Sequence, residues 1–510
     1  MGLSFHDLFH DEQRPDIRFV PNEMQLRAVS TITGPGVYVI EAPMGTGKTE
    51  AALGAAYQLL AGRKARGIYF ALPTQATSNR MHRRMAEFVW RIAPATTQSR
   101  IIHGNSWLSE QEIGFSPAAS GKQEKVEDAR TGRDWFASAK RALLAPFGVG
   151  TVDQALLGVV AAKHFFVRHY ALAGKVVILD EIHSYDIYTG TLVDKLISTL
   201  EGLGCTVIVL SATLTGRRRR QIVSLGDEED SSENLPYPLI TGRREGTPFP
   251  PVPATPPPTR DVDIVFEARD DAARESLALA ENGGCVLWIC NTVDSAQEQY
   301  ARFRALAGGR FRLGLLHSRF PFWRREELEE EWMERLGKTG ATRCASILVS
   351  TQIVEQSVDL DADLLVTELA PTDMLLQRMG RLWRHERGRR PASSPRLIVL
   401  DEAAGLDDLR RMSKGSIVKS LGGKAYVYAP YVLLRSLEVW KGRELVELPA
   451  GIRGLIEATY EERDDEPESW QHLFDEWFAT DSCKRMLAAR NSNLVNRQSK
   501  VDNSLLHVPA

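Results

Sequence analysis

Short apolar runs alternate with longer segments of helical period between about residues 36 and 214. The runs lie at 37–43, 67–73, 175–181 and 206–213, and each is continuously apolar. Such runs are typical of strands covered on both faces in a parallel sheet, whereas a half-exposed strand would alternate apolar and polar residues. Because helical stretches such as 49–62 separate these runs, the sequence predicts a doubly wound α/β domain.

A proline cluster at 247–260 interrupts this alternation. Proline cannot continue a helix or a central strand and holds the chain extended, so we predict a linker there. Strand-like runs then return at 263–267, 285–291, 313–318, 345–351, 363–369 and 396–401. Beyond about residue 402 the periodicity is mostly helical. The predicted order is a lead-in (1–20), an α/β domain (21–246), the linker (247–260), a second α/β domain (261–401) and a helical accessory domain (402–510).

The composition is that of a globular protein. The 510 residues include 63 Lys and Arg against 66 Asp and Glu, a formal charge of −3, so nucleic-acid binding would depend on local basic patches. The five cysteines are an odd and scattered set, which argues against a disulfide framework and predicts a reducing, cytoplasmic location. No run resembles a signal peptide or a membrane span, and the polar stretch 109–134 is predicted to be a surface insertion.

A phosphate-binding loop lies between the first predicted strand and its helix. The segment 42–49 reads AlaProMetGlyThrGlyLysThr and departs from G-x-x-x-x-G-K-[ST] only at its first residue, which is small. The glycines let backbone N–H groups surround a phosphate, the lysine reaches the β- and γ-phosphates, and the threonine can hold Mg²⁺. The nucleotide-binding residues predicted here are Ala42, Gly45, Thr46, Gly47, Lys48 and Thr49.

An acidic pair ends the predicted strand at 175–181. Asp180 is the expected Mg²⁺ ligand, and Glu181 is the expected base for the attacking water. A phosphate loop and an apolar strand that ends in Asp-Glu together are a stronger indication of a nucleotide hydrolase than either signal alone. The cofactors predicted for such an enzyme are ATP and Mg²⁺.

Positive charge for the transition state is expected from the second domain. In a helix over 377–384, Gln377, Arg381 and Arg384 would fall at i, i+4 and i+7 and share one face. Arginines placed in this way can stabilise the γ-phosphate during transfer. A solvated basic helix is the alternative if the segment is considered alone.

Further segments extend the pattern, and together they resemble the superfamily 2 helicases. The segments, in chain order, are Gln25, 42–49, 72–77, 151–154, 180–183, 211–213, 351–359 and 377–384. Within that superfamily the motif sequences are similar to those of the CRISPR-associated helicase-nuclease of type I systems, notably in APMGTGKTEAAL (42–53) and LLQRMGRLWRH (375–385).

The resemblance implies two tandem RecA-like domains and ATP-driven 3′→5′ movement on single-stranded DNA, after recruitment to a crRNA-guided Cascade complex. It implies that Gln25 contacts adenine and that Asp359 joins the ATPase site. It also implies that His183, Ser211 and Thr213 couple hydrolysis to domain motion. The residues expected to contact the DNA backbone are Thr74, Gln75, Thr151, Asn291, His317 and Thr351. Hydroxyl and amide groups can bind phosphates without reading bases, as a motor on arbitrary sequence requires.

The family also carries an N-terminal HD nuclease, for which the roughly forty residues before the phosphate loop leave no room. The pair His6-Asp7 is therefore not read as a metal site, because a dinuclear centre needs ligands from several buried helices. We expect a motor without nuclease activity of its own, with a separate HD nuclease as a possible partner.

Two alternatives stay open: a general superfamily 2 helicase of repair or RNA metabolism, and a subunit that binds nucleic acid and uses ATP only as a clamp.

Two further sequence features have mainly structural interpretations. Arg217 to Arg220 could contact DNA or be solvated, and spacing favours core positions for most of Trp288, Trp323, Trp332 and Trp383.

Overall fold

The computed structural model describes residues 2–10, 18–73, 75–93, 101–103, 143–159, 165–181, 187–223, 235–356, 358–461, 463 and 465–477. The side chains of residues 75–80, 101–103, 165, 187–191 and 356 are not described. The chain forms two compact units, here called the first lobe, which ends at Thr255, and the second lobe, Pro256–Thr480. The predicted insertion at 109–134 lies outside the described residues.

The first lobe is built on a mostly parallel sheet with the strand order β3-β4-β2-β5-β6-β1-β7-β8. Its parallel strands are β1 (Gly36–Glu41), β2 (Ile68–Leu72), β3 (Ile101–His103), β4 (Phe147–Thr151), β5 (Val176–Asp180) and β6 (Thr206–Ser211). The antiparallel β7 (Leu239–Arg244) closes one side of this set by pairing with β1. The strands predicted from apolar runs are confirmed, while β3, β4 and β7 were not predicted.

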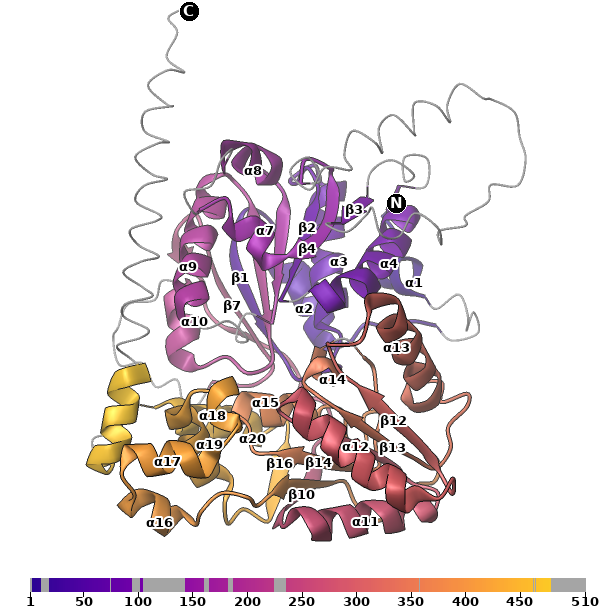
Figure 1. The fold of residues 1–510 in the computed structure, drawn as a ribbon. Helices are drawn as coiled ribbons and strands as arrows, with labels where there is room; N and C mark the ends of the chain where they lie inside the picture. Colours follow the sequence, from indigo (N-terminus) through magenta and orange to yellow (C-terminus); the bar gives the residue numbers. More distant parts are fainter. Residues whose placement is uncertain are drawn as a thin grey trace, which may run out of the picture. The chain divides into compact units, whose positions relative to one another are not determined.

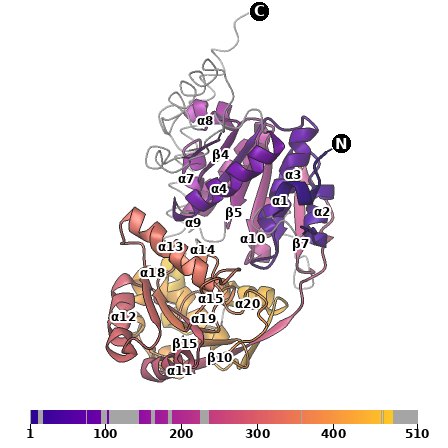
Figure 2. The same ribbon diagram turned by 90° about the vertical axis from the view of Figure 1, so that its right-hand side faces the viewer.

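Helices cover both faces of this sheet (Figures 1 and 2). One face packs against α2 (Glu23–Thr31), α3 (Lys48–Ala61) and α4 (Gln75–Ile92). The other packs against α7 (Val152–Leu156), α8 (Phe165–Leu172), α9 (Ile187–Gly202) and α10 (Gly216–Val223). Alternate residues of β1 enter the two cores, with Tyr38 and Ile40 on the α3 side and Val37 and Val39 on the α9 side. Burial on both faces explains why these strands have no polar alternation.

The predicted lead-in, 1–20, contains a helix of the first lobe. α1 (Phe5–Phe9) buries Leu8, and the Arg91 guanidinium on α4 donates hydrogen bonds to the carbonyl oxygens of Leu8 and His10 at 2.8 and 2.9 Å. His6 accepts a hydrogen bond from the Phe19 amide at 3.1 Å. These contacts give the two histidines a structural role.

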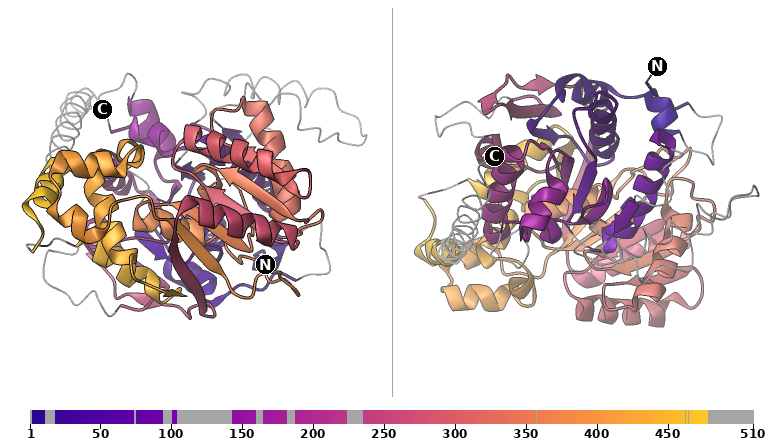
Figure 3. Two further views of the ribbon diagram at one scale, coloured as in Figure 1. Left: turned by 60° about the horizontal axis from the view of Figure 1, so that its bottom comes forward. Right: turned by 90° about the horizontal axis from the view of Figure 1, so that it is seen from above.

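The second lobe repeats the architecture with the strand order β12-β13-β11-β14-β15-β10-β16. Its parallel strands are β10 (Arg260–Glu267), β11 (Cys285–Ile289), β12 (Arg312–Leu316), β13 (Ser346–Ser350), β14 (Leu364–Glu368) and β15 (Arg396–Leu400). α11 (Arg269–Glu281) and α12 (Val293–Ala307) share one hydrophobic core with this sheet (Figure 3). α13 (Phe322–Leu336) contacts β12 at the sheet's edge through Trp332. The two lobes are thus RecA-like α/β units, as predicted.

The described part of the C-terminal segment, residues 402–477, belongs to the second lobe. It is mostly helical, as predicted, with α16 (Leu406–Arg411), α17 (Lys414–Leu421), α18 (Lys424–Val427), α19 (Pro430–Trp440) and α20 (Gly451–Tyr460). However, β16 (Leu445–Leu448) pairs antiparallel with β10, and the Trp440 indole donates to the Thr372 hydroxyl at 2.9 Å. The prediction of a separate accessory domain is wrong for these residues, because they complete the sheet and core of the second lobe.

The predicted linker is shorter than 247–260. β8 (Thr247–Pro248) and β9 (Val252–Pro253) both pair with β7, so the first half of the proline cluster belongs to the first sheet. Proline is tolerated there because these are short strands at the edge of a sheet. The division between the lobes falls between Thr255 and Pro256.

The contact between Gly314 and Trp332 gives a test of the second lobe's packing. A methyl group on Gly314 would lie 2.0 Å from Trp332 Cζ2, and the indole is 1% exposed. We expect Gly314→Ala to lower the free energy of unfolding by about 1 to 3 kcal/mol in denaturant titrations. Gly454→Ala is the matched control, because nothing lies within 4 Å of a methyl group there and α20 favours alanine. Equal stability of the two variants would contradict this packing.

Candidate functional site

The phosphate loop joins β1 to α3, as predicted. Gly45 and Gly47 have φ values of 79° and 81°, in the left-handed region that favours glycine. A methyl group on Gly47 would also lie 2.2 Å from Gln25 Nε2. The loop therefore requires glycine at this position for both backbone and packing reasons.

Gln25 lies directly against this loop. Its amide Nε2 donates to the Gly47 carbonyl oxygen at 3.2 Å, and its Oε1 accepts the Asn22 amide at 2.9 Å in a capping box at the start of α2. Asn22 Nδ2 donates to the Thr46 carbonyl oxygen at 2.8 Å. The structure thus places Gln25 beside the phosphate loop, and its predicted contact with adenine stays a prediction.

Lys48 and Glu181 face each other at the carboxyl end of the sheet. Lys48 Nζ lies 2.9 Å from the carbonyl oxygen of Ala42 and 3.8 Å from Glu181 Oε1. Glu181 has a φ of 50°, which is a strained conformation for a residue with a side chain. The predicted phosphate-binding lysine and the predicted base are therefore neighbours in one lobe.

Asp180 is a half-buried carboxylate that suits a divalent cation. Burial, followed by the negative charge of Glu181, raises the pKa of Asp180 to about 7, although Lys48 and Arg84 oppose this shift. Such a carboxylate is stabilised in its charged form by a nearby cation. Together with Thr49, which lies in the first turn of α3, it fits the Mg²⁺ role predicted for both residues.

Ser211 connects the end of β6 to the loop that binds phosphate. Its carbonyl oxygen accepts the Ala42 amide at 3.1 Å, and its hydroxyl accepts the Thr213 amide at 3.3 Å. Both Ser211 and Thr213 are buried. His183, the third predicted coupling residue, lies outside the described residues.

A buried ion pair beside the phosphate loop was missed by the sequence analysis. Arg219 Nη1 on α10 lies 3.3 and 3.2 Å from the two carboxylate oxygens of Glu41, and both side chains are 2% exposed. Glu41 is the last residue of β1, so the pair joins the strand before the loop to the helix that follows Thr213. Arg218 pairs with Asp194 at 2.7 Å. The solvated interpretation of these two arginines is wrong.

The predicted helix over 377–384 ends before Arg381 and Arg384. α15 (Thr372–Met379) contains Gln377, but the chain leaves the helix at Gly380. Arg381 and Arg384 therefore lie beyond the helix end, and the prediction that they share a helical face with Gln377 is wrong.

Arg381 and Arg384 are nevertheless held in defined positions within the second lobe. Arg381 Nη2 donates to the Glu355 carbonyl oxygen at 2.5 Å, and Arg384 Nε lies 2.6 Å from Asp359 Oδ1. Gln377 is 1% exposed. Burial would raise the pKa of Asp359, but the hydrogen bond from His385 and the charge of Arg384 hold it well below its usual range.

Arg378 is the centre of this region, although no prediction named it. Its guanidinium is fully buried and donates to Glu355 Oε1 at 2.7 Å, to the Thr367 hydroxyl at 2.5 Å and to Asn291 Oδ1 at 3.0 Å. Glu355 lies within the motif at 351–359. One buried cation thus joins the ends of β11 and β14 to the segments that carry Asp359 and Arg384.

The residues predicted to contact DNA are mostly buried. Thr74 and the side chain of Gln75 lie outside the described residues. Thr151 ends β4 and is 7% exposed, while Asn291, His317 and Thr351 are 3%, 4% and 4% exposed at the carboxyl ends of second-lobe strands. The structure gathers these three at one edge of the sheet.

Two of these residues have internal partners. Asn291 uses both ends of its amide, since Nδ2 donates to the Leu369 carbonyl oxygen at 2.7 Å while Oδ1 accepts from Arg378. The His317 ring stacks on Phe320 with centroids 4.3 Å apart, and burial lowers the pKa of the imidazole.

The four tryptophans differ in exposure, and helical spacing predicted core positions for most of them. Trp288 and Trp332 are core residues, Trp383 is half-buried, and Trp323 on α13 is 62% exposed.

The cysteines Cys205, Cys285 and Cys290 are buried, and Cys344 is exposed. Within the described ranges no group of three or more His, Cys, Asp or Glu could hold a metal ion. Among these same ranges no helix is both long and apolar enough to cross a bilayer.

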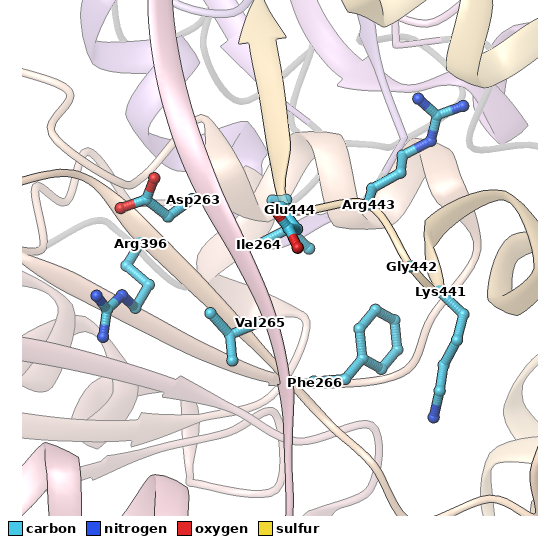
Figure 4. A pocket seen from close by; sticks show the side chains of 9 residues that line it. All are labelled: Asp263, Ile264, Val265, Phe266, Arg396, Lys441, Gly442, Arg443 and Glu444. Carbon is cyan, nitrogen blue, oxygen red and sulfur yellow. The ribbon is translucent and has the colours of Figure 1, made fainter.

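A surface hollow elsewhere in the second lobe contains none of the predicted site residues (Figure 4). It lies along β10 beside the turn from α19 to β16. Three of its charged groups already have partners, since Lys441 pairs with Asp401, Arg396 with Glu275, and Asp263 with the Ser394 hydroxyl. We therefore assign it no part in the chemistry.

Comparison with known proteins agrees with this arrangement. Residues 22–222 match the DEAD/DEAH box helicase family, and residues 282–387 match the C-terminal part of the CRISPR-associated nuclease/helicase Cas3. The endonuclease/helicase Cas3 of Thermus thermophilus is 36% identical over 88% of this chain and 53% of its own length, and that of Escherichia coli is 32% identical over 93% and 54%. The chain therefore spans about half the length of these relatives.

Solved structures show the same similarity. A crystal structure of T. fusca Cas3 with AMPPNP has a TM-score of 0.78 at 30% identity and covers 96% of this chain and 56% of that chain. A chain in a CRISPR RNA-guided surveillance complex has a TM-score of 0.68 at 29% identity and covers 92% and 54%.

By class, the fold and the phosphate-loop site are those of a DEAD/DEAH box helicase. More particularly, the chain corresponds to the helicase portion of the Cas3 family, and we place it there.

The Arg378–Glu355 pair gives a prediction with a defined pH dependence. Arg378→Met would leave the buried Glu355 carboxylate without its cation and should cost about 3 to 5 kcal/mol of unfolding free energy at pH 8. Burial already raises the pKa of Glu355 above its ordinary 4.5, and loss of the arginine raises it further. The folded variant then binds a proton that the unfolded chain releases, so its penalty should shrink as the pH falls toward 5.

Denaturant titrations at pH 5 and pH 8 measure this difference. Arg396→Met is the control, because Arg396 forms a more exposed pair with Glu275 in the same lobe. A penalty for Arg378→Met that matched the control, or that did not change with pH, would show that this pair does not organise the region.

Proposed function

We propose that this chain is an ATP-driven translocase that moves 3′→5′ along single-stranded DNA in type I CRISPR interference. The observation that carries the proposal is the meeting of Lys48, Asp180 and Glu181 at one sheet edge of a chain that matches Cas3. The 3′→5′ direction, the absence of nuclease activity from this chain and its cytoplasmic location are further parts of this proposal.

The first lobe would bind the nucleotide. The backbone N–H groups around Gly45, Thr46 and Gly47 would surround the phosphates, and Lys48 would exchange its carbonyl partners for phosphate oxygens. Gln25 would contact the adenine, since it is already fixed against the loop. Mg²⁺, held by Thr49 and Asp180, would neutralise charge on the phosphates.

Glu181 would accept a proton from the attacking water. Its strained backbone and its position 3.8 Å from Lys48 Nζ suit a group held for chemistry. Gln377, Arg381 and Arg384 would stabilise charge on the γ-phosphate, with Asp359 orienting Arg384. For this step, both arginines would exchange the oxygen partners that they have within the second lobe.

Hydrolysis would be coupled to movement through Ser211, Thr213 and His183. The Ser211 carbonyl oxygen accepts a hydrogen bond from the Ala42 amide of the phosphate loop. A displacement of the loop on phosphate release would therefore move the end of β6. The connection between the lobes at Thr255 and Pro256 would be the hinge. Thr74, Gln75, Thr151, Asn291, His317 and Thr351 would line the DNA path, with the buried amide of Asn291 shaping it through Arg378.

The partner proposed for this chain is a crRNA-guided surveillance complex of the Cascade type. Support comes from the solved surveillance complex, which contains a chain of similar fold at 29% identity. A separate HD nuclease would be a second partner.

A substitution at Glu181 tests the hydrolytic step. We expect Glu181→Gln to lower the ATP turnover number by about a hundredfold or more, because general-base catalysis contributes roughly that factor, while ATP binding is retained. Steady-state phosphate release with single-stranded DNA and equilibrium binding of a fluorescent ATP analogue measure the two quantities. Glu245→Gln, at an exposed position, is the control. Unchanged turnover in Glu181→Gln would remove the assigned base.

The nucleic acid that stimulates turnover separates the proposal from its alternatives. We expect single-stranded DNA to stimulate the wild-type ATPase and RNA to have little effect. Stimulation by RNA alone would favour a general helicase of RNA metabolism. Binding of ATP without any turnover would favour a nucleotide-clamped binding subunit.

A further inference from the structure

The second-lobe edge that is proposed to face DNA holds its predicted DNA-contacting residues in buried positions. The three residues predicted to track the backbone there, Asn291, His317 and Thr351, are each at least 95% buried. A polymer crossing this edge would therefore meet other side chains first.

α18 lies on this edge and is fixed to it. The Tyr428 hydroxyl, just after the helix, accepts from Gln352 Nε2 at 3.3 Å, and the same Nε2 donates to the Asn291 carbonyl oxygen at 2.8 Å. Tyr428 also accepts from Arg378 Nη2 at 3.2 Å. The short helix is thus anchored at the ends of β11 and β13.

Further contacts hold the start of α18. A methyl group on Gly423 would be 3.9 Å from Thr292 Cγ2, so the backbone there lies beside the residue that follows Asn291. Lys424 Nζ pairs with Glu402 at 2.8 Å and is only 11% exposed, although lysine is usually solvated. Figure 1 shows α18 beside α19, which it contacts.

Tyr426 is the exposed member of this anchored segment. Its side chain is 92% exposed, the highest exposure among the large hydrophobic residues that the structure describes. Its backbone amide donates to the Gly423 carbonyl oxygen at 3.2 Å, so the residue is held in a turn while its ring faces solvent. A ring on a fixed backbone loses little conformational entropy when a planar group stacks on it.

We propose that Tyr426 is a stacking platform for one base of the single-stranded nucleic acid. The inference rests on the proposed function and adds a base contact that no motif contains. Stacking on tyrosine is tolerant of sequence because every base has a π-face. Tyr426 would hold a base while the neighbouring edge binds the backbone, which suits a motor that reads no sequence.

Binding of a fluorescently labelled oligonucleotide provides the test. We expect Tyr426→Ala to weaken single-stranded DNA binding by about 5- to 150-fold, the range for loss of one stacked base, and Tyr426→Phe to bind like wild type. Tyr170→Ala is the matched control, since Tyr170 on α8 is 78% exposed and belongs to the first lobe. Thermal unfolding of each variant checks that the fold is intact.

An abasic oligonucleotide separates stacking from other roles. Without bases there is nothing to stack, so wild type and Tyr426→Ala should bind it equally. Equal binding of ordinary DNA by both proteins, or an equal loss on abasic and ordinary DNA, would overturn the platform. If wild type bound neither oligonucleotide, the proposed function itself would fail, and that outcome is read from the wild-type measurement alone.

Discussion

Parallel strand pairing in the first lobe is the constraint on which its chemistry depends. The registers Glu41 to Ser211 and Asp180 to Leu210 bring three strands to an end at the same edge of the sheet. The phosphate loop follows β1 directly, while Asp180 and Ser211 are the last residues of β5 and β6, so separate segments of the sequence meet at this edge. Positive φ angles at Gly45, Gly47 and Glu181 then turn the chain sharply at this edge.

Buried charges hold the surrounding loops in both lobes. Arg219 and Glu41 join β1 to α10, and Arg378 joins Glu355 to the ends of β11 and β14. A buried pair contributes little net stability but is costly to break, so it restricts the loops to one arrangement. In the proposed motor, Arg384 would change partners during turnover, and a restricted set of loop arrangements would keep it close to the position where it would act.

Much of the fold was predictable because its strands are apolar on both faces. The helix that follows the phosphate loop was also predicted, because that motif marks its start. What was missed has physical reasons. β4, FGVGT at 147–151, is rich in glycine, and β16 is short and half-exposed. The helix over 377–384 was predicted from spacing, but Gly380 ends it. Arg378 was missed because its importance comes from burial beside Glu355, which neither spacing nor charge indicates.

The central claim is that arginines of the second lobe act on a nucleotide held by the first. Binding of a fluorescent ADP together with aluminium fluoride, which imitates the phosphate in flight, tests it most directly. We expect wild type to bind this complex far more tightly than ADP alone in the presence of single-stranded DNA, and Arg384→Ala to lose that gain while binding ADP normally. If Arg381→Ala and Arg384→Ala both retained the full gain, the claim would be contradicted.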